Sequence, residues 1–114
     1  QPYRIALPDD APFAFAGIWE RWQRAQGDAL ESCAIITTAA SAMIADIHHR
    51  MPVILEPDSY DAWLTTPDAA LIDAYDGPLR AYPIGTAVNK VVNDDPSLWN
   101  EVEPAPKRGQ IDLF

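Results

Sequence analysis

The stretch Ile47-His48-His49-Arg50-Met51-Pro52-Val53-Ile54-Leu55 places polar side chains at the start of an apolar run. If the backbone is extended there, His48 and Arg50 point to one side of the strand and His49 to the other. Pro52 lacks a backbone donor, which predicts that the strand begins at a sheet edge or after a bend. An imidazole beside a fixed cation suits an anionic substrate, because Arg binds phosphate or carboxylate while His transfers a proton. The alternative is a strand entrance with two solvated polar side chains.

The composition is that of one small domain. The chain has 114 residues, a net charge of −9 from 8 basic and 17 acidic residues, and a single Cys. No apolar segment reaches membrane-spanning length, and one Cys allows no internal disulfide, which predicts a reducing, cytoplasmic compartment. The negative net charge argues against binding nucleic acid through overall charge, but a chain of this net charge can still carry a local basic cleft.

Hydrophobic alternation and turn residues predict a mostly antiparallel α+β fold, a sheet or partial barrel with a few short helices. The expected strands span residues 3–7, 13–22, 31–38, 51–55, 79–84 and 87–92. The second is expected to pair with the first, with a bulge at Gly17, and the third is apolar enough to be central and buried. Short helices are expected at 39–47, 57–64 and 68–75.

Cys33 and the tryptophans are candidate functional side chains with structural alternatives. Cys33 lies in an apolar run with no His or Asn near it in sequence, which predicts a buried, inert thiol rather than a nucleophile. Tryptophans can stack on nucleic-acid bases. Trp63 shares an apolar helix face with Leu64, so we expect it in the core. Trp19 and Trp22 fall on opposite faces of a strand, so we expect at most one of them to be exposed to a ligand.

Three segments, in this order and spacing, carry a family resemblance: Phe13–Glu20, Ser32–Thr38 and Ile47–Leu55, with further similarity at residues 60–64 and 82–89. They resemble the SOS response-associated peptidase family over nearly the whole chain. The most specific element is the I-H-x-R-M-P run that follows I-I-T-T. The family usually carries an acid where this chain has His49, a departure that should leave the His48 and Arg50 pair unaffected.

The resemblance implies a mostly β domain with a cleft for single-stranded DNA, which covalently captures abasic sites. In that family an N-terminal Cys condenses with the ring-opened sugar aldehyde to form a thiazolidine cross-link, and in some members this Cys is thought to arise by autoproteolysis. The resemblance therefore implies an enzyme that needs no cofactor or metal, is a monomer when complete and has no membrane partner.

Residue by residue, His48 aligns with the family's active-site His, and Arg50 and Thr37 align with positions that hold the DNA backbone. The Cys nucleophile, the cleft Asn and Arg, and the catalytic Glu of a Y-E-W type motif lie upstream of Gln1 in the family. Glu20, within W-E-R-W, does not match that Glu. The first residues show neither an initiator Met nor a signal-peptide pattern. We therefore expect the C-terminal part of a single domain over 1–103, inactive alone, followed by an extended tail over 104–114.

Each assigned role has a structural alternative. His48 can assist sugar ring opening or Schiff-base hydrolysis, or it can be a structural His bonded to the backbone. Arg50 can contact a phosphate or form a surface ion pair, and Thr37 can offer a hydroxyl or be a strand former. Asp46, His48 and His49 crowd together, but neighbours on a strand diverge, so no metal site is predicted. A non-catalytic DNA- or clamp-binding module is the rival function.

The last five residues, Gln110-Ile111-Asp112-Leu113-Phe114, form an apolar end after a polar linker. They are similar to the short motif by which bacterial proteins bind the replication sliding clamp. In that motif the Gln makes polar contacts while the Leu and Phe fill a hydrophobic pocket, which assigns Gln110, Leu113 and Phe114 to a clamp site. Alternatively, Leu113 and Phe114 fold back onto the domain.

Overall fold

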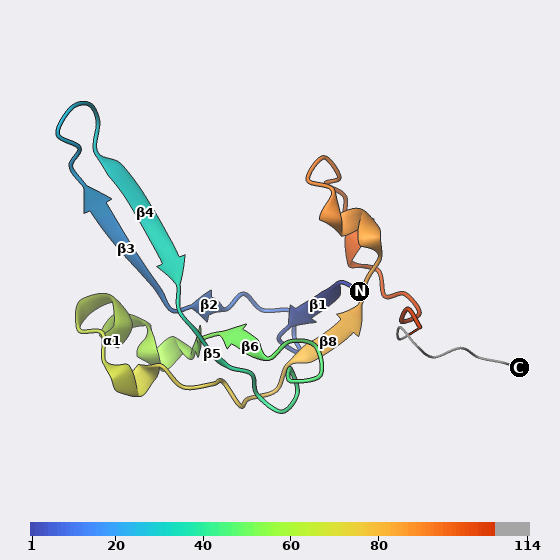
Figure 1. Ribbon diagram of the computed structural model, residues 1–114. Coiled ribbons are helices and arrows are strands. Elements are labelled where there is room, and N and C mark those ends of the chain that lie inside the picture. Colours follow the sequence, from blue (N-terminus) through green and yellow to red (C-terminus); the bar gives the residue numbers. More distant parts are fainter. Residues whose placement is uncertain (107–114) are drawn as a thin grey trace, which may run out of the picture. The chain divides into compact units, whose positions relative to one another are not determined.

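The computed structural model describes residues 1–106, and the chain divides into two compact units. The terminal unit joins Gln1–Asp10 to the chain from Leu79 onward, and the middle unit is Ala11–Pro78. The expected mostly antiparallel class with short helical segments is confirmed: residues 1–106 form two-stranded antiparallel ladders, one short α-helix and several 3-10 turns (Figure 1). Within this range no helix combines the length and apolarity needed to cross a bilayer.

In the terminal unit the first strand pairs with a strand from late in the sequence. β1 (Tyr3–Ala6) is antiparallel to β8 (Arg80–Pro83), in a register that places Arg4 opposite Tyr82. The strand expected at 87–92 is wrong. The chain forms a 3-10 turn, η3 (Thr86–Asn89), and Val91 is 99% exposed. An apolar alternation becomes a strand only where a partner strand supplies hydrogen bonds, and residues 87–92 have none within the described chain.

In the middle unit each expected long strand is divided in two by a single residue. β2 (Ala14–Phe15) and β3 (Gly17–Trp22) flank Ala16, β4 (Leu30–Ile35) and β5 (Thr37–Ala39) flank Ile36, and β6 (Arg50–Pro52) and β7 (Ile54–Leu55) flank Val53. The ladders are β2 with β7, β3 with β4, and β5 with β6. The expected pairing of residues 13–22 with the first strand is therefore wrong, and the break lies at Ala16 rather than as a bulge at Gly17.

The three dividing residues bind one another in a closed ring, here called the three-strand junction (Ala16, Ile36 and Val53). Ala16 N donates to Val53 O at 2.8 Å, Val53 N donates to Ile36 O at 2.9 Å, and Ile36 N donates to Ala16 O at 2.9 Å. Ala16 and Val53 are both 0% exposed. Each strand can thus change partners without leaving a buried backbone group unpaired, which is the physical requirement at such a crossing.

The core of the middle unit lies beside this junction. Ala16, Val53 and Leu55 pack against Trp63, which comes from α1 (Tyr60–Thr65), a helix entered through the 3-10 turn η1 (Pro57–Ser59). The Trp63 Nε1–H donates to Gly17 O at 2.9 Å, which satisfies the polar atom of the buried indole. The core position predicted for Trp63 is confirmed. Leu64 is 79% exposed instead of buried, because successive helix residues differ by about 100° around the axis.

The helices expected at residues 39–47 and 68–75 are wrong. Residues 42–47 form consecutive turns in which Ser41 O accepts from both Ile44 N and Ala45 N, so no regular helical ladder is established. This segment is the connection between β5 and β6, closed by the bond from Ala40 N to His49 O at 3.0 Å, and its two ends are held by that ladder. The helix expected at 68–75 is reduced to the 3-10 turn η2 (Ala69–Leu71).

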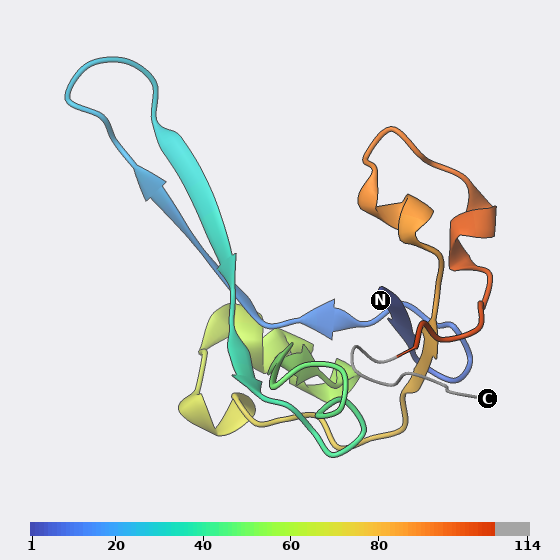
Figure 2. The same ribbon diagram turned by 45° about the vertical axis from the view of Figure 1, so that its right-hand side comes forward.

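The β3–β4 hairpin departs most from expectation. Every residue of both strands is exposed, so the central, buried position predicted for residues 31–38 is wrong. Cys33 is also exposed rather than buried. Trp19 and Trp22 are 71% and 59% exposed, so both are accessible where at most one was expected. Figures 1 and 2 show the hairpin extending away from α1 and the β5–β6 ladder of its own unit.

Candidate functional site

The candidate site is built on the short β5–β6 ladder beside the three-strand junction. Its register places Thr37 opposite Pro52, Thr38 opposite Met51 and Ala39 opposite Arg50. Thr37 and Arg50 are therefore diagonal neighbours on one face of the ladder, within reach of a long side chain. The structure thus brings together the two residues assigned to DNA binding, although they are 13 positions apart in sequence.

The Arg50 guanidinium is oriented by Thr37. Its Nη2 donates to Thr37 O at 2.8 Å and to Thr37 Oγ1 at 3.0 Å. Within residues 1–106 no carboxylate forms an ion pair with Arg50, so the ion-pair alternative finds no support in that part of the chain. Because a guanidinium carries five N–H donors and Thr37 engages a single nitrogen, Arg50 retains donors for an anionic ligand. Arg50 is exposed, so a ligand can reach these donors.

The sequence predicted that His48 and Arg50 share one face of a strand, and this prediction is wrong. The chain bends at His49 and β6 starts at Arg50, so the extended backbone required for that prediction is missing. The His48 ring instead folds onto the backbone of Arg50. His48 Nδ1 lies 3.0 Å from Arg50 N and 2.8 Å from Arg50 O. The imidazole and the guanidinium are thus coupled through the backbone of one residue.

These two contacts can hold the His48 ring in either protonation state. When the neutral ring carries its proton on Nε2, Nδ1 accepts from the Arg50 N–H; when Nδ1 carries a proton, in the other neutral tautomer or in the cation, Nδ1–H donates to the Arg50 carbonyl. Nε2 makes no hydrogen bond within residues 1–106 and belongs to an exposed residue. Nε2 is therefore the ring atom that can exchange a proton with a ligand without a change in ring orientation.

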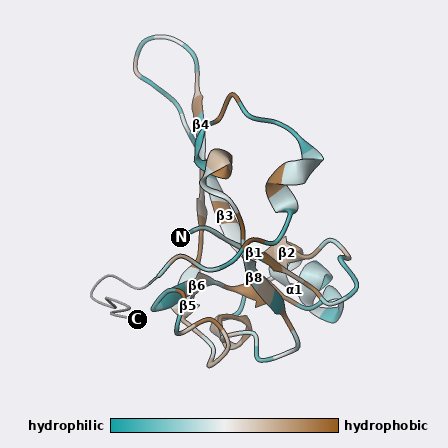
Figure 3. Cartoon of the chain, turned by 90° about the vertical axis from the view of Figure 1, so that its right-hand side faces the viewer, coloured by the Kyte–Doolittle hydropathy of each residue, from teal (hydrophilic) through white to brown (hydrophobic). Residues whose placement is uncertain are grey.

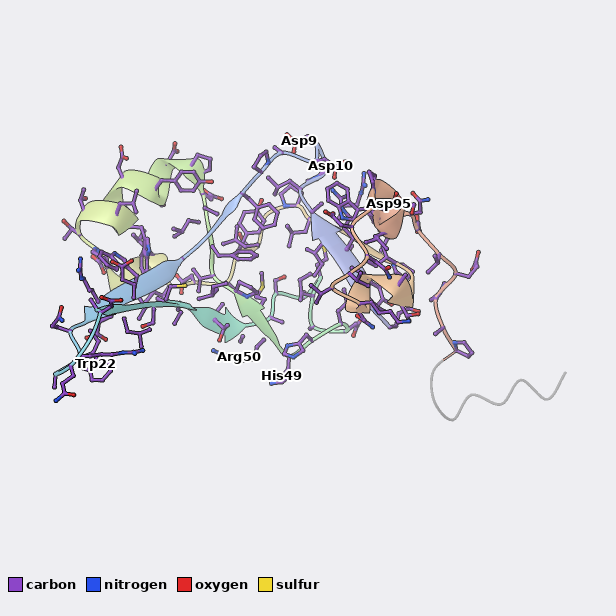
Figure 4. All side chains as sticks on the ribbon, turned by 90° about the horizontal axis from the view of Figure 1, so that it is seen from above. Asp9, Asp10, Trp22, His49, Arg50 and Asp95 are labelled. Carbon is purple, nitrogen blue, oxygen red and sulfur yellow. The ribbon has the colours of Figure 1, made fainter. Side chains whose placement is uncertain are left out.

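His49 lies against His48 as a second ring. The ring centroids are 4.5 Å apart with an interplanar angle of 22°, a stacked arrangement. Figure 4 shows His49 and Arg50 as neighbours at one edge of the middle unit. No group of three His, Cys, Asp or Glu side chains within residues 1–106 is arranged to hold a metal ion.

The other sequence candidates lie elsewhere. Cys33 is opposite Trp19 on the β3–β4 hairpin, and within residues 1–106 no hydrogen bond links it to His48 or Arg50. The candidate clamp residues Gln110, Leu113 and Phe114 lie outside the described residues.

Sequence reasoning missed a cluster in the terminal unit centred on Arg4. Arg4 Nη1 donates to Asp10 Oδ1 at 2.9 Å and to the Tyr82 hydroxyl at 3.0 Å, and its guanidinium lies 4.5 Å from the Trp99 ring centroid. The hydrogen bond to Tyr82, and then that to Asp10, raise the pKa of the Arg4 guanidinium. Arg80 lies over the Tyr82 ring and reaches Asp10 at 3.8 Å. The only sequence signal was Arg4 within a short apolar strand, because a charged side chain is rarely buried unless a polar or oppositely charged group pairs with it.

Comparison with known proteins agrees with the residue pattern. The model of the SOS response associated peptidase (SRAP) family matches residues 1–91. The abasic site processing protein YoqW of Bacillus subtilis is 40% identical over 104 residues, covering 85% of this chain and 46% of YoqW. The abasic site processing protein HMCES of Gallus gallus is 35% identical over 95 residues, covering 77% of this chain and 28% of HMCES. The chain thus spans less than half the length of these relatives.

A solved structure shares the fold. A crystal structure of a protein from Bacteroides thetaiotaomicron superposes with a TM-score of 0.76 at 31% identity, covering 90% of this chain and 48% of that one. With the family model matching most of the chain, the conclusion follows directly: this chain belongs to the SRAP family.

Proposed function

We propose that this chain takes part in processing abasic sites in single-stranded DNA, with Arg50 and Thr37 holding the DNA backbone and His48 transferring protons at the damaged sugar. The observation that carries the proposal is the coupling of His48 Nδ1 to the backbone of Arg50, whose guanidinium is oriented by Thr37. A phosphate bound at the guanidinium therefore brings its sugar close to the imidazole. Relatives named for abasic site processing support this substrate class.

The proposed chemistry for His48 is sugar ring opening. The closed abasic sugar is a hemiacetal, and opening moves the proton of the C1′ hydroxyl to the ring oxygen, which leaves an aldehyde and a free hydroxyl. In the neutral tautomer whose Nδ1–H donates to Arg50 O, Nε2 is unprotonated and can accept the first proton and return it to the ring oxygen, while Nδ1–H keeps its hydrogen bond to Arg50 O throughout. No net proton is gained or lost, and the ring does not need to rotate.

We further propose that the chain is the C-terminal part of an SRAP domain, monomeric when complete and located in the cytoplasm. The nucleophile would then be an N-terminal Cys in the segment before Gln1, and its thiol and amine would condense with the aldehyde to form a thiazolidine with loss of water. The same Cys would serve any autopeptidase activity. That the chain is one part of a longer domain is supported by its coverage of 46% of YoqW.

Denaturing gel electrophoresis with an abasic single-stranded oligonucleotide tests the placement of the nucleophile. The 114-residue chain alone should give no covalent adduct, whereas the whole protein should give one that resists denaturation. An adduct formed by the chain alone, and lost in Cys33→Ser, would overturn this placement and assign the nucleophile to the exposed Cys33. An undamaged oligonucleotide of the same sequence is the control.

A clamp-binding role for the tail is a separate proposal. The segment Gln110–Phe114 combines a Gln with a terminal Leu-Phe pair, which can enter an apolar pocket in extended form. Binding to the replication sliding clamp would bring the chain to single-stranded DNA at replication forks. If the whole protein forms no cross-link but the tail binds the clamp, the non-catalytic binding module becomes the better description.

A further inference from the structure

Met51 lies beside Arg50 in β6 but faces the opposite side of the β5–β6 ladder. Thr37 and Arg50 are exposed on one face, whereas Met51 is 4% exposed and stands opposite Thr38 on the other. Successive side chains of a strand point to opposite sides of the sheet, so Met51 faces away from a ligand held by Arg50. The chemistry proposed above therefore leaves this buried side chain without a role.

The Met51 sulfur holds the start of the segment that leads to His48, residues 41–48, here called the connecting turn. Ser41 N donates to Met51 Sδ at 3.3 Å, in a partly buried position. Within residues 1–106 the Ser41 N–H has no other acceptor. A thioether is a weak acceptor, but it satisfies a backbone donor that would otherwise lose its hydrogen bond on folding.

Backbone hydrogen bonds carry this restraint through the connecting turn to His48. Ser41 O accepts from Ile44 N at 3.0 Å, and Ile44 O accepts from His48 N at 3.0 Å. Ile44 is 3% exposed, and Figure 3 shows hydrophobic colouring along much of the chain between β5 and β6. The connecting turn is therefore anchored by Met51 at its start and by Ile44 in its middle, and His48 is its last residue.

We propose that Met51 is a positioning residue for His48: its thioether holds the connecting turn in the conformation that sets the imidazole against the backbone of Arg50. The imidazole is then restrained from two directions, because Nδ1 contacts Arg50 N and O at 3.0 and 2.8 Å and the His48 N–H is bonded within the turn. A displaced turn would move Nε2 away from a bound sugar. This proposal rests on the proton-transfer role proposed for His48.

The Arg50 guanidinium should be unaffected by the contact between Met51 and the turn. It is oriented by Thr37 O and Thr37 Oγ1 on the exposed face of the ladder, and neither bond passes through the connecting turn. Met51 should thus influence proton transfer at the sugar and leave phosphate binding as it is. A side chain that merely filled space could be replaced by an apolar group of equal volume without any effect on the His48 ring.

Met51→Leu in the whole protein separates the two explanations, because Leu keeps the apolar volume but offers no acceptor. Nitrogen NMR of histidine-labelled protein reports on the ring, with His48→Ala identifying the His48 signals. In Met51→Leu these signals should shift toward those of a free imidazole. The cross-linking rate at saturating abasic oligonucleotide should fall about ten- to hundredfold through misplacement of the imidazole, while the affinity for the oligonucleotide stays nearly unchanged.

The matched control is Met43→Leu, since Met43 lies in the same connecting turn but is 51% exposed. It should leave the ring signals, the rate and the affinity unchanged. If Met51→Leu does not fold, norleucine, which has the shape of Met with a methylene in place of the sulfur, is placed at position 51 by peptide ligation and should give the same changes. Unchanged His48 ring signals in a folded protein without the Met51 sulfur, or equal changes in Met43→Leu, would overturn the proposal.

The proposals for Met51 and for His48 fail in different ways. If His48→Ala leaves the cross-linking rate unchanged, the proton-transfer role fails, yet the ring signals of Met51→Leu still decide whether Met51 positions the imidazole. If those signals stay in place while His48→Ala slows cross-linking, the role of His48 stands and Met51 is only a packing residue.

Discussion

Replacing Arg50 with Ala tests the proposed phosphate contact without disturbing His48. The His48 ring is held by the backbone N and O of Arg50, which an Ala retains, so its orientation should persist. The side chain that is removed carries the hydrogen bonds to Thr37 at 2.8 and 3.0 Å and the donors left for a ligand. The substitution thus separates backbone binding from proton transfer.

The magnitude follows from the charge on the donor. A hydrogen bond to a charged group contributes about 1.5–3 kcal/mol, so Arg50→Ala should weaken single-stranded DNA binding roughly 10- to 150-fold. Without this phosphate interaction, the slope of log affinity against log salt concentration should fall by about 0.7 for a single strand. Arg50→Lys should keep most of the slope but bind more weakly, because an ammonium cannot reproduce the planar fork that Thr37 orients.

Fluorescence anisotropy of a labelled abasic oligonucleotide, titrated with the whole protein at several salt concentrations, measures both quantities. Arg21→Ala is the matched control, since Arg21 is an exposed Arg of the hairpin paired with Glu31. Its slope should equal that of the unmodified protein. The phosphate-binding role of Arg50 is disproved if Arg50→Ala and Arg21→Ala change affinity and slope equally, or if Arg50→Ala alters only the stability of the fold.

Further predictions concern catalysis, packing, pH and the tail. His48→Ala in the whole protein should slow cross-link formation or reversal by at least about a hundredfold with DNA affinity nearly unchanged, as gel time courses would show; equal rates would make His48 structural. Val53→Ala, at a fully buried junction position, should cost about 2–3 kcal/mol in urea unfolding; a destabilisation under about 0.5 kcal/mol would contradict the packing described. Hydrogen bonds from the Ser97 side chain and then from the Ser97 backbone N–H, at the start of η4 (Pro96–Trp99), lower the pKa of the Asp95 carboxyl. The cap therefore stabilises above the unfolded pKa of about 3.9 and is lost as pH falls through the lower folded value. Amide protection in η4, taken as the intrinsic exchange rate relative to the observed rate at each pH, should fall at acid pH, and Asp95→Asn should abolish this dependence. A peptide of residues 104–114 should bind the sliding clamp of the source organism with micromolar affinity. Burial contributes about 1.5–3 kcal/mol for each of the Leu113 and Phe114 side chains, and the free-energy cost of ordering the peptide offsets part of it. Equal binding by a Leu113→Ala, Phe114→Ala double variant would refute this prediction.

The site shows where sequence reasoning succeeds and where it does not. The I-H-x-R-M-P run identified the family, and Thr37 and Arg50, assigned to one role from the resemblance, are hydrogen-bonded in the structure. The same-face arrangement of His48 and Arg50 was wrong, because alternation applies only within a strand and the chain bends at His49. The contact that replaces it, from the ring of His48 to the backbone of Arg50, leaves no periodic trace in a sequence.

Cys33 and Trp19 illustrate a second limit. An apolar run predicts burial only if another layer covers it, and the amino-acid types in the run do not reveal whether such a layer is present. The composition of the residues from Leu30 to Ile35 predicts a central strand, yet each of them is exposed. The physical reason is that β4 pairs with β3 alone within residues 1–106, and no other element of the described chain covers either face of this ladder.

Local features follow from the sequence alone: strand-forming alternation, turn positions, the antiparallel class and the family. They depend on residue type and on spacing over a few positions, which short segments of chain encode. Strand pairing is settled only in three dimensions, because pairing partners are distant in sequence and alternation is the same whichever strand lies alongside. Ala16, Ile36 and Val53 are ordinary apolar residues in the sequence, yet their closed ring of hydrogen bonds divides three strands, directs the hairpin away from the core and sets Thr37 beside Arg50.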